Sequence, residues 1–218
     1  MDWFPFFLSM RVALVATLVA TVLGVTAGWV FARHDFPGRR WLEAILTVPI
    51  VLPPTVLGYY LLVTIGRQSK IGRAWESVFG EPIVFTWKAA AVASTVAAFP
   101  FVLRTSRAAI AEIDVRFEHA ARTMGFPEWR IALQITLPLA RLGIFAGIAL
   151  GFARALGEFG ATVMIAGNIP GRTQTMPVAI YSQVEAGNQH AAMIMSLILT
   201  GMAIVALIAV GRFEKRPA

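Results

Sequence analysis

The sequence predicts an all-α, polytopic membrane protein with about five transmembrane helices and one short helix outside the membrane. Charged residues make up only 14% of the chain, against about a quarter in soluble domains, and the mean hydropathy is +0.70. The apolar residues are gathered in long runs. The first run, residues 12–32, contains no charged residue and as a helix would span about 31 Å, close to the hydrocarbon thickness of about 30 Å. We therefore treat residues 1–218 as a single membrane domain.

The first run is predicted to be an uncleaved span. It is too long for the apolar part of a signal peptide, and its flank, with Asp2, lacks a basic region. Further spans are predicted at about residues 44–66, 87–103, 138–157 and 191–211. Lys88 and Arg154 fall within two of them, so their side chains must reach the interface or find partners. Residues 159–169 leave open a sixth, short crossing.

Proline and glycine interrupt the second span in VPIVLPPTVLGYY, residues 48–60, which includes Pro53 and Pro54. Backbone groups that such residues leave unpaired are tolerated at membrane depth only where protein or a water-filled path surrounds them. We expect this helix to lie beside a translocation path. The alternative is a kinked helix that serves packing alone.

The distribution of basic residues predicts an orientation and argues against nucleic-acid binding. The chain has 19 Lys and Arg residues and a formal net charge of +7, but they lie at the ends of the apolar runs and form no single patch. With the N-terminus outside and the C-terminus cytoplasmic, most of them fall on the cytoplasmic side, as the positive-inside rule requires. The absence of cysteine excludes disulfides, thiol catalysis and thiolate metal sites, and the three histidines are too far apart to suggest a metal site.

A hydrophilic segment, about residues 108–137, separates the third and fourth spans and contains a predicted helix at residues 115–124. Asp114 can cap its N-terminus, Gly125 can end it in the left-handed conformation, and Pro127 prevents its continuation. One face carries an apolar stripe at helical spacing, formed by Phe117, Ala120, Ala121 and Met124. The other face is expected to present polar side chains to water or to a partner, namely Arg116, Glu118, His119, Arg122 and Thr123. The helix could pack on the protein's own spans or dock into a groove of a soluble partner, and the pattern favours neither use.

The stretch HAARTMGFPEWRIALQITLP, residues 119–138, resembles the cytoplasmic EAA loop of bacterial ABC importer permeases. That loop has an acidic residue, two alanines, three residues, Gly, nine residues, Ile, one residue and Leu-Pro. The matching residues here are Ala120, Ala121, Gly125, Ile135, Leu137 and Pro138. The sequence departs from the pattern at His119, which stands where the acidic residue is usual, and Glu118 precedes it.

Two further stretches resemble the molybdate branch of these permeases: VPIVLPPTVLG, residues 48–58, and FARALGEFGATVMIAGNIPGRTQTMPVAIY, residues 152–181. Sulfate permeases are similar but tend to have Tyr where Phe159 stands. The resemblance implies a homodimeric permease in the bacterial inner membrane, surrounded by lipid, with ATP-hydrolysing subunits on the cytoplasmic side and an extracytoplasmic binding protein that delivers the oxyanion. Permeases for sulfate, thiosulfate or tungstate remain alternatives, as does, from a different class, an ATP-independent channel or membrane scaffold.

The chain has no GxxxxGK[ST] phosphate-binding loop, so another polypeptide must handle ATP, and neither catalysis nor a cofactor is expected in this one. Together with the resemblance, this absence favours docking as the use of the hydrophilic helix. The residues expected to couple it to the ATPase are Phe117, Glu118, His119, Ala120, Ala121, Arg122, Met124 and Gly125.

Candidate residues of a translocation path lie in the spans. Arg154 and Glu158 are four residues apart, which suits a mutual ion pair as well as a functional site. Because a transported ion must be released, many weak contacts suit passage better than one strong site. Backbone groups near Pro53 and Pro54 and the hydroxyls of Ser94 and Thr95 could supply such contacts. The polar stretch NIPGRTQTMP, residues 168–177, is expected outside, as a solvated loop, an outer gate or a contact for the binding protein.

Overall fold

The computed structural model of the chain describes residues 2–214; residues 1 and 215–218 of the expected domain lie outside this part. Within residues 2–214 the regular elements are all helical, which confirms the predicted class. The elements are α1 (Phe4–Arg33), α2 (Arg39–Thr47), the 3-10 turn η1 (Val48–Ile50), α3 (Pro54–Ile65), α4 (Lys70–Phe79), α5 (Trp87–Ala111), α6 (Val115–Thr123), α7 (Glu128–Ile131), the π-helical turn η2 (Ala132–Thr136), α8 (Leu137–Leu139), α9 (Arg141–Leu156), α10 (Gly160–Ala166), α11 (Met176–Glu185) and α12 (Gln189–Glu214).

Among the described residues, three helices are long and apolar enough to cross a membrane: α1, α5 and residues Gln189–Ile208 of α12. Two bent pairs raise the number to five if each pair is one span. The first pair joins Arg39–Ile50 to Pro54–Ile65 at 113°, and the second joins Glu128–Leu139 to Arg141–Leu156 at 78°. About five spans is therefore a fair description, but the second and fourth are not straight helices.

The break in the second predicted span has a local cause. Pro53 has an extended backbone (ψ 136°), and it precedes Pro54, which disfavours a helical conformation for the residue before it. Neither proline can donate a backbone hydrogen bond. The interrupted span predicted over residues 44–66 is thus divided among α2, η1 and α3.

Two other boundaries differ from the prediction. The sequence places the end of the third span at residue 103, but α5 continues to Ala111, because Arg104 and Arg107 end the apolar run without ending the helix. Residues 159–169 form only α10, whose seven residues reach about 10 Å and are too short to cross a membrane. The sixth crossing that the sequence left open is therefore not formed by these residues.

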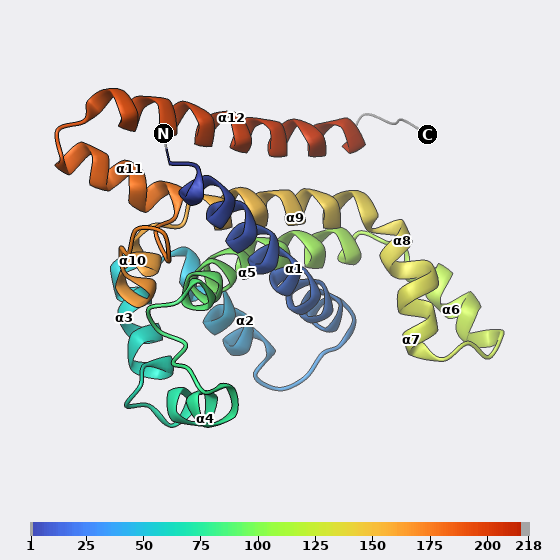
Figure 1. Cartoon of the computed structure of the whole chain (residues 1–218). Coiled ribbons are helices and arrows are strands. Elements are labelled where there is room, and N and C mark those ends of the chain that lie inside the picture. Colours follow the sequence, from blue (N-terminus) through green and yellow to red (C-terminus); the bar gives the residue numbers. More distant parts are fainter. Residues whose placement is uncertain (1, 215–218) are drawn as a thin grey trace.

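Helices α1, α5 and α9 pack side by side at the centre of the molecule (Figure 1). Small residues allow the approach of α1 to α5: a Cβ on Gly24 would lie 2.9 Å from the Cβ of Val102, and one on Gly28 would lie 3.0 Å from the backbone nitrogen of Arg107. Such small-residue contacts are typical of helix packing in membranes, where van der Waals contact replaces the hydrophobic drive. In Figure 1, α6 and α7 lie at one end of this core and α4 and α10 at the other.

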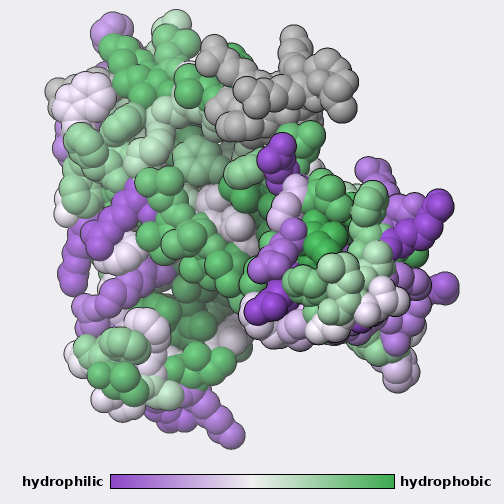
Figure 2. Space-filling view, turned by 90° about the vertical axis from the view of Figure 1, so that its right-hand side faces the viewer, coloured by the Kyte–Doolittle hydropathy of each residue, from purple (hydrophilic) through white to green (hydrophobic). Residues whose placement is uncertain are grey.

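Much of the surface is apolar, as a lipid-facing protein requires. Leu14, Leu18 and Val22 on α1 are 59%, 68% and 60% exposed. Figure 2 shows broad hydrophobic areas across the face in view, with hydrophilic side chains in separate clusters between and beside them.

Candidate functional site: the exposed helix α6

Helix α6 begins and ends almost where the sequence predicts. The Asp114 carboxylate accepts a hydrogen bond from the backbone N–H of Arg116 at 2.9 Å, which is an N-cap. At the other end Gly125 has φ +81°, in the left-handed region that favours glycine, and the helix stops. The predicted helix over residues 115–124 is confirmed to within one residue at its end.

The residues of the apolar stripe of α6 do not all face the same way. Ala121 is buried, whereas Phe117 and Met124 are 57% and 74% exposed and Ala120 is also exposed. Two large apolar side chains on a hydrophilic segment, with no covering from the protein's own spans, indicate a contact surface for another molecule. The sequence allowed α6 either to pack on the protein's own spans or to dock on a partner. Phe117 and Met124 do not pack on the protein's own spans.

The placement of Glu118 corrects the prediction. The sequence puts it on the outward polar face, but it is only 2% exposed. Its carboxylate accepts hydrogen bonds from Arg33 Nε and from the Thr136 hydroxyl, each at 2.7 Å, and lies 3.7 Å from an Arg122 nitrogen. Glu118 shares the inward side of the helix with Ala121, three residues on. His119, in contrast, is exposed, and its place at a partner surface stays a prediction.

Arg122 ties α6 to the following helix. It donates two hydrogen bonds to Glu128, at 2.6 and 3.0 Å. The hydrogen bond from Arg122 holds the pKa of the Glu128 carboxyl below its usual value, and the same bond raises the pKa of Arg122. A cavity of about 360 Å³ lies beside this network and is lined by residues that include Trp29, Arg33, His34 and Glu118.

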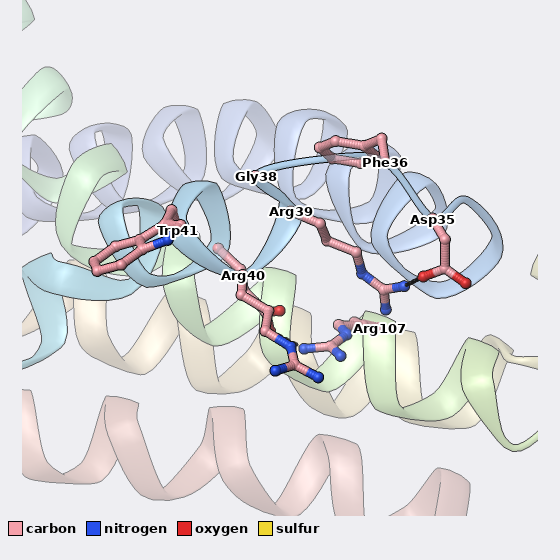
Figure 3. A pocket seen from close by; sticks show the side chains of 8 residues that line it. Asp35, Phe36, Gly38, Arg39, Arg40, Trp41 and Arg107 are labelled. Carbon is pink, nitrogen blue, oxygen red and sulfur yellow. Dashed lines mark hydrogen bonds and ion pairs between the residues drawn. The ribbon is translucent and has the colours of Figure 1, made fainter.

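A second cavity, of about 470 Å³, lies between the α1–α2 loop and α5 (Figure 3). Its arginines are largely neutralised, because Arg39 pairs with Asp35 and Arg107 pairs with Glu43. Arg40 and Arg107 point into the same space in Figure 3. This cavity shares no lining residue with the one beside Glu118.

The candidate path residues fall into two groups. Arg154 and Glu158 form an ion pair at 2.6 Å, and Glu158, only 2% exposed, also accepts the backbone N–H of Ala161 at 2.9 Å. The mutual pair is thus the geometry observed. Pro54 lies close to the segment that follows this ion pair, since a Cβ on Gly160 would lie 2.6 Å from the Pro54 Cβ. Pro53 precedes it and is exposed.

Ser94 and Thr95 form the second group, on α5. Ser94 is 1% exposed, and the Thr95 hydroxyl donates to the carbonyl of Ala91 at 2.7 Å. Ser94 is thus covered within the single chain, whereas Thr95 is half-buried, and the role of both hydroxyls in a path stays a prediction. Ser94 is covered because α5 is the central helix and packs against α1, α9 and α10.

Residues 20–218 match the family described as the inner membrane component of binding-protein-dependent transport systems. The chain belongs to this family. It is 40% identical over 208 residues to the molybdenum transport system permease protein ModB of Escherichia coli K12, covering 95% of this chain and 91% of that protein. It is 46% identical over 184 residues to the putative molybdenum transport system permease protein YvgM of Bacillus subtilis, covering 84% and 81%. The sulfate transport system permease protein CysW of a Synechocystis strain is 34% identical over 209 residues, covering 96% and 75%.

Solved structures agree on the fold. An inward-facing form of the MetNI methionine ABC transporter matches with a TM-score of 0.72 at 18% identity, over 95% of this chain and 92% of that one. A bacterial ABC transporter involved in the import of the acidic polysaccharide alginate matches with a TM-score of 0.75 at 12% identity, over 98% of this chain and 78% of that one. The permease is accordingly a transport subunit and not an enzyme, and its family implies separate ATP-binding subunits and a substrate-binding protein.

The sequence reasoning missed several residues of the exposed site on the permease. Trp129 in α7 is 60% exposed, Leu133 is 58% exposed, and the Arg130 guanidinium lies 5.5 Å from the Trp129 ring centre. The sequence did contain a signal for Trp129, because an aromatic residue in a hydrophilic segment indicates a contact surface. Arg33 carried no such signal, because it stands 85 positions before Glu118 at the end of a membrane span.

Proposed function

We propose that the chain is the membrane-spanning subunit of an ATP-driven importer that moves molybdate into the cytoplasm by alternating access. Two copies would form the permease, with ATP-binding subunits on the cytoplasmic side and an extracytoplasmic binding protein on the other. The observation that carries the proposal is the exposed face of α6, which presents large apolar side chains on a segment that the protein's own spans leave uncovered.

The ATPase would bind this face. Phe117 and Met124 supply apolar anchors, Ala120 and Gly125 let a partner approach the backbone, and His119 lies on the same exposed surface. An amphipathic helix that inserts its apolar side chains into a groove is a common recognition mode. Arg122 borders the surface, while Glu118 and Ala121 support it from inside.

The substrate assignment rests on the relatives. Those named for molybdenum transport are 40–46% identical to this chain, and those named for sulfate transport are 31–36% identical. A tetrahedral oxyanion fits both groups, and the higher identity favours molybdate, with tungstate, sulfate and thiosulfate as alternatives. Arg154 is held by Glu158, which suits a brace beside the path better than a fixed trap for the ion. Pro53, Pro54, Ser94 and Thr95 would border the path only once a second copy or another conformation completes it.

We propose an orientation in the bacterial inner membrane with the N-terminus outside and the C-terminus cytoplasmic. The start of α1 lies near α11, and the end of α12 lies toward the side of the molecule that carries α6 (Figure 1). This arrangement supports the placement of α6 and the C-terminus on the same side of the membrane.

Uptake into vesicles tests the substrate. With the cognate ATPase and binding protein present, labelled molybdate should enter on addition of ATP and should be preferred over labelled sulfate. A preference for sulfate would reverse the substrate assignment. Equal uptake with and without ATP would support the channel alternative instead.

A further inference from the structure

The buried carboxylate of Glu118 is the centre of an ionic cluster that joins three parts of the chain. Arg33 comes from the end of α1, Thr136 from η2, and Arg122 from α6 itself. Arg33 and Glu118 are both nearly buried, with side chains 9% and 3% exposed. We propose that Arg33 and Thr136 are positioning residues for ATP-driven transport: through Glu118 they fix the direction of α6 and carry its movement to α1 and α9. This inference rests on the proposed docking of an ATPase on α6.

Arg33 is held firmly enough to act as an anchor. It is the last residue of α1, and Gly28, five residues earlier, lets α1 approach α5 so closely that a Cβ there would lie 3.0 Å from the backbone of Arg107. The position of Arg33 relative to α5 is therefore set by backbone packing. Its guanidinium donates both to Glu118 and to the carbonyl of Ile113, at 3.3 Å, in the turn between α5 and α6. One side chain thus fixes both the turn and the helix that follows it.

Thr136 connects the Glu118 carboxylate to η2, the turn that leads toward α9. It is fully buried and donates its hydroxyl to Glu118 from the last residue of η2. The chain bends by 78° just beyond this point, where Glu128–Leu139 meets Arg141–Leu156. A π-helical turn inside a helix is a common feature of functional sites. Through Thr136, Glu118 is attached to the segment that leads into α9.

The burial of charge makes this attachment stiff. Removing a carboxylate from water is costly unless it is paired. If α6 moved away from Arg33, Glu118 would lose its two hydrogen bonds of 2.7 Å and keep only Arg122 of the same helix, 3.7 Å away. In Figure 1, α6 and α7 lie at the end of the helical core and not within it. Apart from Glu118, only Ala121 is buried within α6, so apolar packing alone holds the helix weakly. The cluster is therefore the main device that makes α6 move together with the spans.

The experiment uses the full complex of permease, ATPase and binding protein in proteoliposomes. The variants are Arg33→Gln, Arg33→Lys, Thr136→Val, Glu118→Gln and the double change Arg33→Gln with Glu118→Gln. Arg39→Gln is the matched control, because Arg39 also pairs with a carboxylate, in the neighbouring α1–α2 loop, and does not contact Glu118. The readouts are the amount of assembled complex, the ATP hydrolysed per complex, and the molybdate transported per ATP.

We expect Arg33→Gln and Thr136→Val to assemble and hydrolyse ATP but to transport about fivefold less molybdate per ATP, the lower end of typical coupling between sites. Arg33→Lys, which keeps the charge, should fall between Arg33→Gln and the wild type, and the double variant should regain part of the ratio because no buried charge is left unpaired. Arg39→Gln should match the wild type. If the variants reduce only the amount of complex and leave transport per ATP unchanged, the positioning role is wrong.

A second readout separates this inference from the proposed function. Backbone hydrogen exchange of residues 115–136 in the assembled complex should be faster in Arg33→Gln than in the wild type or Arg39→Gln. If wild-type complexes transport no molybdate but this difference is found, the substrate proposal fails and the positioning role stands. If exchange in Arg33→Gln equals that of the wild type, Arg33 does not hold α6.

Discussion

The crossing of α3 and α10 depends on Gly58. A Cβ at this position would lie 2.7 Å from the Cβ of Met164 and 2.9 Å from the Cα of Ala161. Ordinary contact begins at 3.4 Å, so Gly58→Ala requires the two helices to separate by about 0.7 Å (3.4 − 2.7). The Met164 Cβ and the Ala161 Cα cannot move without the backbone of α10, so a rotation of Met164 Cγ, also 2.9 Å away, would not relieve the overlap. Overpacking of this kind typically costs about 1–3 kcal/mol.

Gly201→Ala in α12 is the matched control, because a Cβ added to Gly201 would meet no other atom within 4 Å. Both changes replace a helical glycine by alanine and gain about 1 kcal/mol of helix propensity, so this gain cancels in the comparison. The difference between the two variants should equal the overpacking cost. The melting temperature of the purified protein should therefore be lower for Gly58→Ala, by about 2–4 °C per kcal/mol for a chain of this size. Equal melting temperatures would refute the close crossing.

Three further changes test other parts of the structure. Phe117→Ala should change the stability of the permease by no more than about 0.5 kcal/mol, since the ring is exposed, but it should reduce co-purification of the ATPase. The control Phe79→Ala on α4, where the ring is 56% exposed, should not reduce co-purification. If both variants lost the ATPase to the same extent, the docking surface on α6 would be contradicted. Asp114→Ala should lower the stability by about 1 kcal/mol through loss of the N-cap, while Asp114→Asn should retain most of it, as thermal unfolding can show. Because the chain has no cysteine, single cysteines introduced as Thr123→Cys and Ser77→Cys can report orientation. An impermeant thiol reagent should label Thr123→Cys only from the cytoplasmic side and Ser77→Cys only from outside. The reverse pattern would overturn the proposed topology.

The features that could be predicted from the sequence are those with local causes. The caps of α6 at Asp114 and Gly125 follow from side-chain and backbone preferences within a few residues, and both are found. The long apolar runs likewise indicated α1 and α12. Pro53 and Pro54 signalled a disturbance in the second span, although not a bend as large as 113°.

The features that could not be predicted depend on contacts between distant segments. The helical period of α6 places Glu118 on a polar face, and nothing near it in the sequence shows that Arg33 and Thr136 convert that face into an interior. The burial of Ser94 is similar, because it depends on α5 being covered by neighbouring helices. Hydropathy also could not place the end of α5, since arginines at the end of a span remain helical.

Replacement of Gly125 by tryptophan tests the central claim, that an ATPase docks on α6, most directly. Gly125 and Gly80 both end a helix with positive φ, +81° and +72°, and a Cβ on either would meet no atom within 4 Å. Gly125→Trp and Gly80→Trp therefore carry a similar backbone cost of about 1–2 kcal/mol, but only the first places a large ring on the α6 surface. We predict that Gly80→Trp retains co-purification of the ATPase and ATP-driven uptake, whereas Gly125→Trp loses both. If Gly125→Trp assembled with the ATPase and transported as well as Gly80→Trp, the docking of the ATPase on α6 would be contradicted.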